Sequence, residues 1–337
     1  MPRIPSFRLT YAGVDITADL VPHTLSISYT DKLEGESDEL SIRLANSDRR
    51  WMAAWLPGEG DSVSLELGYE NEEFLGPIAF EVDEPEWAGV PDTFQLKGLA
   101  TPITKSLRQR NSQAYEDTTL RAIAQQIAEK HGLELIGEIP SINLKRVTQK
   151  EQADLQFLKD LAAEYGLLFK VESTSRLVFF READLEAATP VITLNRKDLT
   201  SYRIRRQAAG VYKAATVSYQ DPESGDFIEA TIDLAGAEVE PSDDEEGAIS
   251  SGDILRVRER CEDRGQAETK AKEALKRANS TRLEASLELE GNVLLSAGIT
   301  LTLTGFERLS GKYLIDQVRH SLDRGRGYRS SIQIRKV

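Results

Sequence analysis

Two stretches of this 337-residue chain, far apart in the sequence, carry the same order of features. The stretches are GDSVSLELGYENEEFLGPIAFEV (60–82) and AGITLTLTGFERLSGKYLIDQV (297–318). Each has a glycine, an alternating strand, a glycine-aromatic pair, an acidic turn, a second glycine and another strand. Gly68-Tyr69 matches Gly305-Phe306 and Gly76 matches Gly311, although the register slips by one residue ahead of the glycine-aromatic pair. An imperfect repeat of this kind predicts two copies of one β fold.

The first copy occupies residues 1–107. Apolar and polar residues alternate in short runs separated by turn signals, which is typical of half-buried strands. Short strands at this spacing, without long helices, predict a sandwich or a barrel. The runs centre on Leu9, Ile27, Ile42, Leu65, Phe80 and Leu96.

The period changes to that of helices between residues 108 and 190. The run TTLRAIAQQIAEKHG places its large apolar residues on one helical face, with Asp117 as the expected N-cap and Gly132 as the stop. A second helix, ADLQFLKDLAAEYG, is followed by strands at 167–171 and 177–180. This pattern predicts an α/β module inserted between the two β units, with each helix covering a sheet face.

Strand alternation returns over residues 191–337, interrupted by the helix AETKAKEALKRAN. The segment at about 236–252 has few large apolar residues and four consecutive acids, Asp243 to Glu246. It predicts a flexible acidic insertion in the second β unit, either solvated or ordered against a basic partner surface.

Composition excludes several classes of function. There are 42 Lys and Arg against 56 Asp and Glu, for a net charge of −14, which disfavours nonspecific binding of the whole chain to nucleic acid or anionic lipid. The single cysteine, Cys261, excludes an intrachain disulfide and any multi-cysteine metal site, as expected for folding in a reducing cytosol. We see no apolar run long enough for a membrane helix.

No motif predicts catalytic, cofactor-binding or metal-ligating residues. His23, His131 and His320 are scattered, and Cys261 stands in RVRERCEDRG, which is typical of a solvated helix surface. The stretch GFERLSGK resembles a phosphate loop but has the wrong glycine spacing and Tyr313 in place of Ser or Thr, so it predicts a hairpin turn. Glu84 and Glu86 flank Pro85, which favours an edge or a loop over a cleft.

Three stretches, in order, resemble the phage late control gene D family. They are DITADLVPHTLSISYTDKLEGESDELSIRL, with Asp38 beside its alternating strand, QADLQFLKDLAAEYGLLFKV in the middle, and LSAGITLTLTGF with GKYLIDQVRHSLDRGRGYRSSIQI near the end. Members of this family are baseplate hub proteins of contractile phage tails and related bacteriocins, similar in fold to the N-terminal part of the VgrG spike proteins of type VI secretion.

The resemblance implies a homotrimer with two tail-tube-like β-barrels per chain, forming a pseudo-sixfold ring between the sixfold tail tube and the threefold central spike. It implies a non-enzymatic protein assembled in the bacterial cytoplasm and carried in the tail baseplate of a virion or a bacteriocin particle. The implied partners are the central spike, the tail tube and other baseplate or tape-measure components, with no membrane and with DNA only passing through the lumen. The net charge permits a negative lumen that repels this DNA. The chain lacks the β-helical spike sequence of VgrG proteins, so a separate spike subunit is expected.

Two alternatives come from other classes of function. A tail-associated peptidoglycan hydrolase needs a carboxylate pair with one member in an apolar pocket or a zinc triad, for which the sequence offers no strong candidate. A nucleic-acid-binding module would use the basic C-terminal stretch, but alternation predicts that its arginines point to different faces of a hairpin. These arginines are Arg319, Arg324, Arg326, Arg329 and Arg335.

Overall fold

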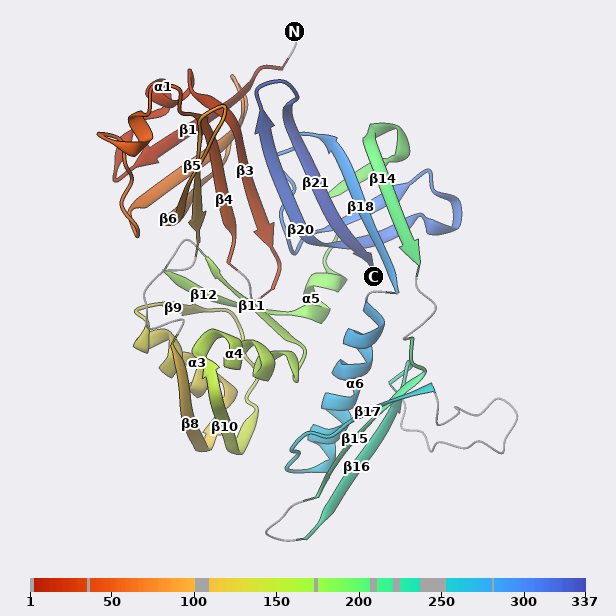
Figure 1. Cartoon of the computed structure of the whole chain (residues 1–337). Helices are drawn as coiled ribbons and strands as arrows, with labels where there is room; N and C mark the ends of the chain where they lie inside the picture. Colours follow the sequence, from red (N-terminus) through yellow and green to blue (C-terminus); the bar gives the residue numbers. More distant parts are fainter. Residues whose placement is uncertain are drawn as a thin grey trace.

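The structure, a computed structural model, describes residues 3–34, 37–100, 109–172, 175–206, 211–220, 225–236, 253–280 and 282–337. Most of its regular structure is β, with a few helices, of which α5 and α6 lie near the centre of the molecule (Figure 1). Of the acidic insertion expected at 236–252, all but Gly236 lies outside the described residues.

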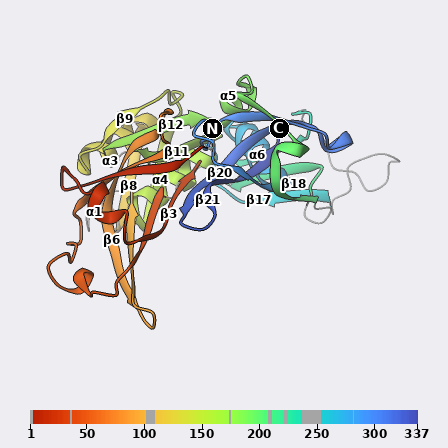
Figure 2. The ribbon, with the colours of Figure 1, turned by 90° about the horizontal axis from the view of Figure 1, so that it is seen from above.

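One 13-stranded sheet runs through both β units. Figure 2, the view from above, shows the two units side by side along it. The strands of the first unit are β1 (Pro5–Tyr11), β2 (Val14–Asp15), β3 (Thr24–Lys32), β4 (Glu39–Ala45), β5 (Ser62–Tyr69), β6 (Leu75–Ala88) and β7 (Thr93–Leu99), with the short helices α1 (Thr17–Leu20) and η1 (Arg50–Met52). Those of the second unit are β13 (Ile192–Asn195), β14 (Leu199–Arg206), β18 (Leu283–Glu290), β19 (Thr300–Thr304), β20 (Gly311–Asp323) and β21 (Gly327–Lys336), with η2 (Arg196–Asp198) and η4 (Glu307–Leu309).

The two units have the same strand order, which confirms the predicted repeat. In the first unit the order is β1-β5-β6-β7-β4-β3, and in the second it is β13-β19-β20-β21-β18-β14. The pairings correspond one to one, except that β1 is antiparallel to β5 whereas β13 is parallel to β19.

Irregularities in the ladders also repeat at equivalent positions. The β3–β4 ladder shifts between Thr24 and Ser26, and the β14–β18 ladder shifts between Leu199 and Ser201. Equivalent residues of β3 and β14 are therefore 175 positions apart in the sequence. The ladder of β6 with β7 shifts across Asp83, and that of β20 with β21 shifts across Asp316, an offset of 233. Bulges kept at the same place in both copies indicate a duplicated backbone rather than a shared composition.

The glycines of the sequence repeat do not all align in the structure. The β5–β6 ladder shifts between Leu65 and Leu67, with the extra residue on β6. By the offset of 233, Gly311 is equivalent to Ile78, since Gly311 pairs with Leu303 in the second unit and Ile78 pairs with Leu65 in the first. The expected match of Gly76 to Gly311 is therefore off by two residues.

Neither unit forms a closed barrel within the described residues, so the expectation of two barrels in one chain is not met. The physical reason is that β3 pairs with β20 of the other unit, in the register Tyr29 to His320, which joins the units into one open sheet. In Figure 1, β3 and β4 lie next to β20 and β21 without a break.

The inserted module has its own sheets and its own core. The helices α3 (Leu120–Lys130) and α4 (Asp154–Ala163) pack with the small sheet β11-β12-β9 and with the two-stranded sheet β10-β8. The N-cap of α3 is Thr119, whose hydroxyl accepts from the Ala122 amide, and not Asp117 as expected. The remaining bounds are β8 (Arg110–Thr119), β9 (Glu134–Ile136), β10 (Asn143–Ala153), β11 (Leu167–Glu172), β12 (Arg176–Arg181) and α5 (Glu182–Ala187).

A further small sheet is formed by residues that lie between β14 and β18 of the second β unit in the sequence. It comprises β16 (Phe227–Asp233), β15 (Ala214–Gln220) and β17 (Ile254–Val257), and α6 (Arg264–Ser280) packs on it. Its buried cluster is separate from that of the 13-stranded sheet. Residues from 191 onward therefore hold two cores.

Candidate assembly interface

The 13-stranded sheet presents one continuous polar face across both units. Side chains alternate along each strand, so the ladder registers define this face from β14 to the second half of β6. Between its charges lie mainly Ser, Thr and Gln. The basic side chains are Lys32, Arg43, Lys97, Arg203, Arg205, Arg319, Arg329 and Arg335, and the acidic ones are Glu39, Glu84, Glu86, Glu284, Glu288, Glu290 and Asp323.

Eight basic groups, of which Arg335 is buried against Glu182 and Asp316, and seven acidic groups make this face balanced in charge, in contrast to the net charge of the whole chain. Several of them pair across strands, including Lys97 with Glu84 at 2.7 Å and Arg329 with Glu288 at 2.8 Å. A balanced face of paired charges has no strong field for either nucleic acid or basic protein.

Two open edges border the polar face in the part of the chain that the structure describes. β14 stands last in the strand order and there forms a ladder only with β18. The second half of β6 forms a ladder only with β7, because the β5 ladder stops at Glu81. Open edges expose backbone donors and acceptors that can pair with another chain.

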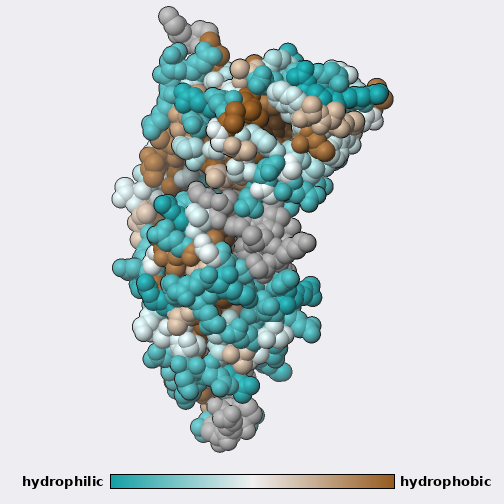
Figure 3. Space-filling model, turned by 90° about the vertical axis from the view of Figure 1, so that its left-hand side faces the viewer, coloured by the Kyte–Doolittle hydropathy of each residue, from teal (hydrophilic) through white to brown (hydrophobic). Residues whose placement is uncertain are grey.

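An apolar hollow lies at the end of the first β unit. Figure 3, which views the left-hand side of the molecule in Figure 1, shows hydrophobic side chains gathered around a hollow in its upper part. Its lining includes Leu9, Trp51, Trp55, Leu56 and Phe94. Trp55 and Leu56 keep 36% and 53% of their surface exposed.

A buried charge network joins the three parts of the chain. The Lys170 ammonium of β11 lies 2.9 Å from Asp31 Oδ1 and 3.6 Å from Asp38 Oδ2, both in the first β unit. The other Asp31 oxygen accepts the Ala297 amide of the second unit at 2.7 Å. Burial raises the pKa of Asp38 to about 6, although Lys170 opposes this shift. Burial lowers the pKa of Lys170, but the two aspartates outweigh it and hold that pKa above its usual value.

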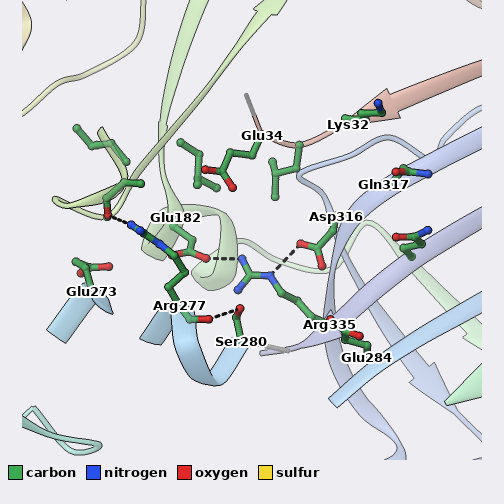
Figure 4. A pocket seen from close by; sticks show the side chains of 16 residues that line it. Lys32, Glu34, Glu182, Glu273, Arg277, Ser280, Glu284, Asp316, Gln317 and Arg335 are labelled. Atoms are coloured by element: carbon green, nitrogen blue, oxygen red, sulfur yellow. Dashed lines mark hydrogen bonds and ion pairs between the residues drawn. The ribbon is translucent and has the colours of Figure 1, made fainter. Parts of the chain in front are cut away.

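A second network closes the polar pocket between α5, α6 and the C-terminal strands (Figure 4). The Arg335 guanidinium lies between Glu182 at 2.5 Å and Asp316 at 2.9 Å. Lys276 of α6 pairs with Glu182 at 3.1 Å. Burial raises the pKa of Asp316 to about 6, against the effect of Arg335. These groups satisfy one another and hold the module, α6 and the sheet together.

The histidines noted in the sequence lie apart. His23 lies near Trp51, and His131, which follows α3, contacts Asp154 at 2.8 Å. His320 is fully buried on β20, where its Nε2 donates to the Leu295 carbonyl, so Nδ1 accepts from the Tyr328 hydroxyl. Burial lowers the pKa of His320 to about 4. Within the described ranges, no group of three or more His, Cys, Asp or Glu could hold a metal ion.

Two sequence predictions about surfaces are wrong. Cys261 is buried beside α6, not solvated, because its small apolar side chain packs with Ala267 and Val217, and burial raises its pKa to about 11. Arg319, Arg329 and Arg335 share the polar face instead of pointing to different faces. Arg319 pairs with Ser331, and Arg329 and Arg335 lie on the same side of β21 as Ser331 because side chains alternate along the strand.

Two further sequence predictions, for GFERLSGK and for Glu84 with Glu86, are confirmed. GFERLSGK forms the β19–β20 hairpin turn, with η4 inside it. Glu84 and Glu86 lie exposed on an edge segment of β6. No helix among the described residues is both long and apolar enough to cross a bilayer.

Comparison with known proteins identifies the family. The model of the phage tail baseplate hub (GPD) family matches residues 39–325, and the chain belongs to this family. A probable baseplate hub protein of Escherichia phage 186 is 27% identical over 228 residues, which cover 65% of this chain and 58% of that protein. The corresponding protein of Escherichia phage P2 is 26% identical over the same shares. The chain thus spans less than two thirds of the length of these relatives.

Solved structures show the same fold at low identity. A tail protein from Neisseria meningitidis MC58 has a TM-score of 0.73 and 12% identity, with 98% of this chain and 96% of that chain covered. The 43 kDa tail protein of prophage MuSo2 from Shewanella oneidensis has a TM-score of 0.72 and 16% identity, with 98% of each chain covered. An E. coli component of the type VI secretion system has a TM-score of 0.56 and 12% identity, with 93% of this chain and 73% of that chain covered.

Proposed function

We propose that this protein is the structural, non-enzymatic hub of the baseplate in a contractile phage tail or a phage-tail-like bacteriocin. Three copies would form a pseudo-sixfold ring that joins the sixfold tail tube to the threefold central spike. The observation that carries the proposal is the duplicated strand order, with bulges at equivalent positions, in a member of the hub family. Two similar units per chain supply six similar positions from three chains.

A ring would also account for the open edges of the sheet and for its polar face. An open sheet with an edge at each end can close when copies join end to end, and closure removes exposed edges. The polar face would then line the channel, and its balanced, paired charges would let DNA or protein pass with little binding.

The domain division follows the same argument. We assign residues 1–107 and 191–337 to the two tube-like units, and residues 108–190 to a module outside the ring. The module's strands form no ladder with the 13-stranded sheet among the described residues, so it interrupts no wall pairing. The module, the apolar hollow and the acidic insertion would be available to the spike, the tube and other baseplate or tape-measure components. Assembly would take place in the bacterial cytoplasm.

Sedimentation of the protein with its cognate spike protein tests the proposal. We expect three copies of this chain per complex. Two or six copies would overturn it.

A further inference from the structure

We propose that the ring is joined by one backbone ladder, in which β14 of one copy pairs antiparallel with residues 84–88 of β6 in the next copy. This inference rests on the proposed trimer and names the surfaces that form it. Both edges belong to the same chain, so the contact is head to tail and can repeat around a ring.

Both edges are open in the part of the chain that the structure describes. The pairing of β6 with β5 ends at Glu81, and the adjoining Val82 amide bonds to the Asp61 carbonyl at 2.9 Å. Beyond that point, within the part of the chain that the structure describes, β6 has a ladder only with β7. β14 likewise has a ladder only with β18.

The chain contains a template for this joint. By the offset of 175, β14 is the copy of β3, and by the offset of 233, β20 is the copy of β6. Inside the chain β3 pairs with β20, which is the equivalent of β14 pairing with β6. Because one chain has two units, the second joint of this type can form only with another copy.

The template fixes the register. Tyr29 opposite His320 becomes Ile204 opposite Trp87, Thr30 opposite Arg319 becomes Arg205 opposite Glu86, and Ser28 opposite Ser321 becomes Arg203 opposite Ala88.

Side-chain chemistry at these positions is complementary. The β14 edge carries Arg203, Arg205 and Arg206, whereas the β6 segment carries Glu84 and Glu86, all of them exposed. In the template register, Arg205 and Glu86 stand directly opposite on the polar face, where opposite charges favour pairing.

The apolar side of the joint is also incomplete in one chain. Trp87 keeps 36% of its surface exposed, and Ile204 is half-buried on the matching side of β14. At the equivalent joint inside the chain, Tyr29 stacks on His320 with centroids 6.1 Å apart and only 5% of Tyr29 is exposed. Ile204 would cover Trp87 in the same way.

Cysteine cross-linking at the predicted register tests the joint in the full-length protein. Arg203→Cys with Ala88→Cys places two thiols opposite each other across the interface. The matched positive control, Ser28→Cys with Ser321→Cys, is the same pair of positions at the joint within the chain. The negative control, Ser201→Cys with Glu84→Cys, lies about 20 Å out of register. Cys261 stays in every variant because it is buried.

On oxidation of concentrated protein with its spike, we expect Arg203→Cys/Ala88→Cys to give linked chains that stop at three. The positive control should give an intrachain disulfide, and the negative control should give no linked chains. Monomers alone from the test pair, with the positive control oxidised, would overturn the ladder even if sedimentation still finds three copies. Linked chains running past three would instead support the ladder and contradict the proposed trimer.

Discussion

Replacing Lys170 with methionine should destabilise the junction between the module and the two β units. The variant keeps the aliphatic volume of the side chain but leaves Asp31 and Asp38, each 4% exposed, without the ammonium that lies within 4 Å of both. Removing one partner of a buried ion pair typically lowers the free energy of unfolding by about 3 to 5 kcal/mol.

The loss should depend on pH in a definite direction. The folded-state pKa of Asp38, about 6, is above the unfolded value of about 3.9. Between these values the folded protein binds more protons than the unfolded chain, so the free energy of unfolding falls as the pH rises. Lys170 opposes this trend, so the deficit of the variant should be larger at pH 7 than at pH 5.

Urea unfolding at pH 5 and pH 7, followed by fluorescence, measures both effects. Lys150→Met, at an exposed position of β10, is the matched control and should change stability by less than about 0.5 kcal/mol. A Lys170→Met variant within 1 kcal/mol of the wild type at pH 7, or a deficit relative to the wild type that is smaller at pH 7 than at pH 5, would refute the reasoning.

Three further outcomes follow from individual contacts. Asp154→Asn should lower stability by about 2 kcal/mol at pH 7, because hydrogen bonds from Gln149, Lys130 and His131 outweigh burial and hold the pKa of Asp154 at about 2. The wild-type advantage should fade in thermal melts as the pH falls from 4 toward 2. Arg205→Glu should weaken assembly on the spike at least about tenfold, measured by sedimentation. Adding Glu86→Arg in the same chain should restore assembly. Arg121→Glu, on the exposed face of α3, should have no effect in the same assay. Gly137→Ala should lower the melting temperature, because a Cβ there would lie 2.3 Å from the Phe179 carbonyl oxygen and φ is +102°. A melting temperature equal to that of the wild type would contradict this, since it would show that the backbone shifts freely.

The strands of the 13-stranded sheet were largely predictable because each buries one face. Alternation such as Leu283, Ala285, Leu287 and Leu289 marks the inward side chains directly. By contrast, the β8–β10 pair escaped prediction because Arg110–Thr119 and Asn143–Ala153 have few apolar residues and are exposed along most of their length.

The partners of strands and of buried charges could not be predicted in the same way. Backbone hydrogen bonds do not depend on side-chain identity, so the sequence of β3 does not indicate that its partner strand is β20. Lys170 and Asp31 stand 139 residues apart, and only the fold brings them together. Cys261 shows the opposite error, since its charged neighbours in sequence conceal a residue that is only 1% exposed.

An electron-microscopy image of the protein assembled on its spike tests the central claim most directly. We predict a closed ring with threefold symmetry, six similar β densities around a central channel, and three peripheral modules. A particle without a channel, or a ring with twofold or true sixfold symmetry, would contradict the assignment of this protein as a trimeric hub.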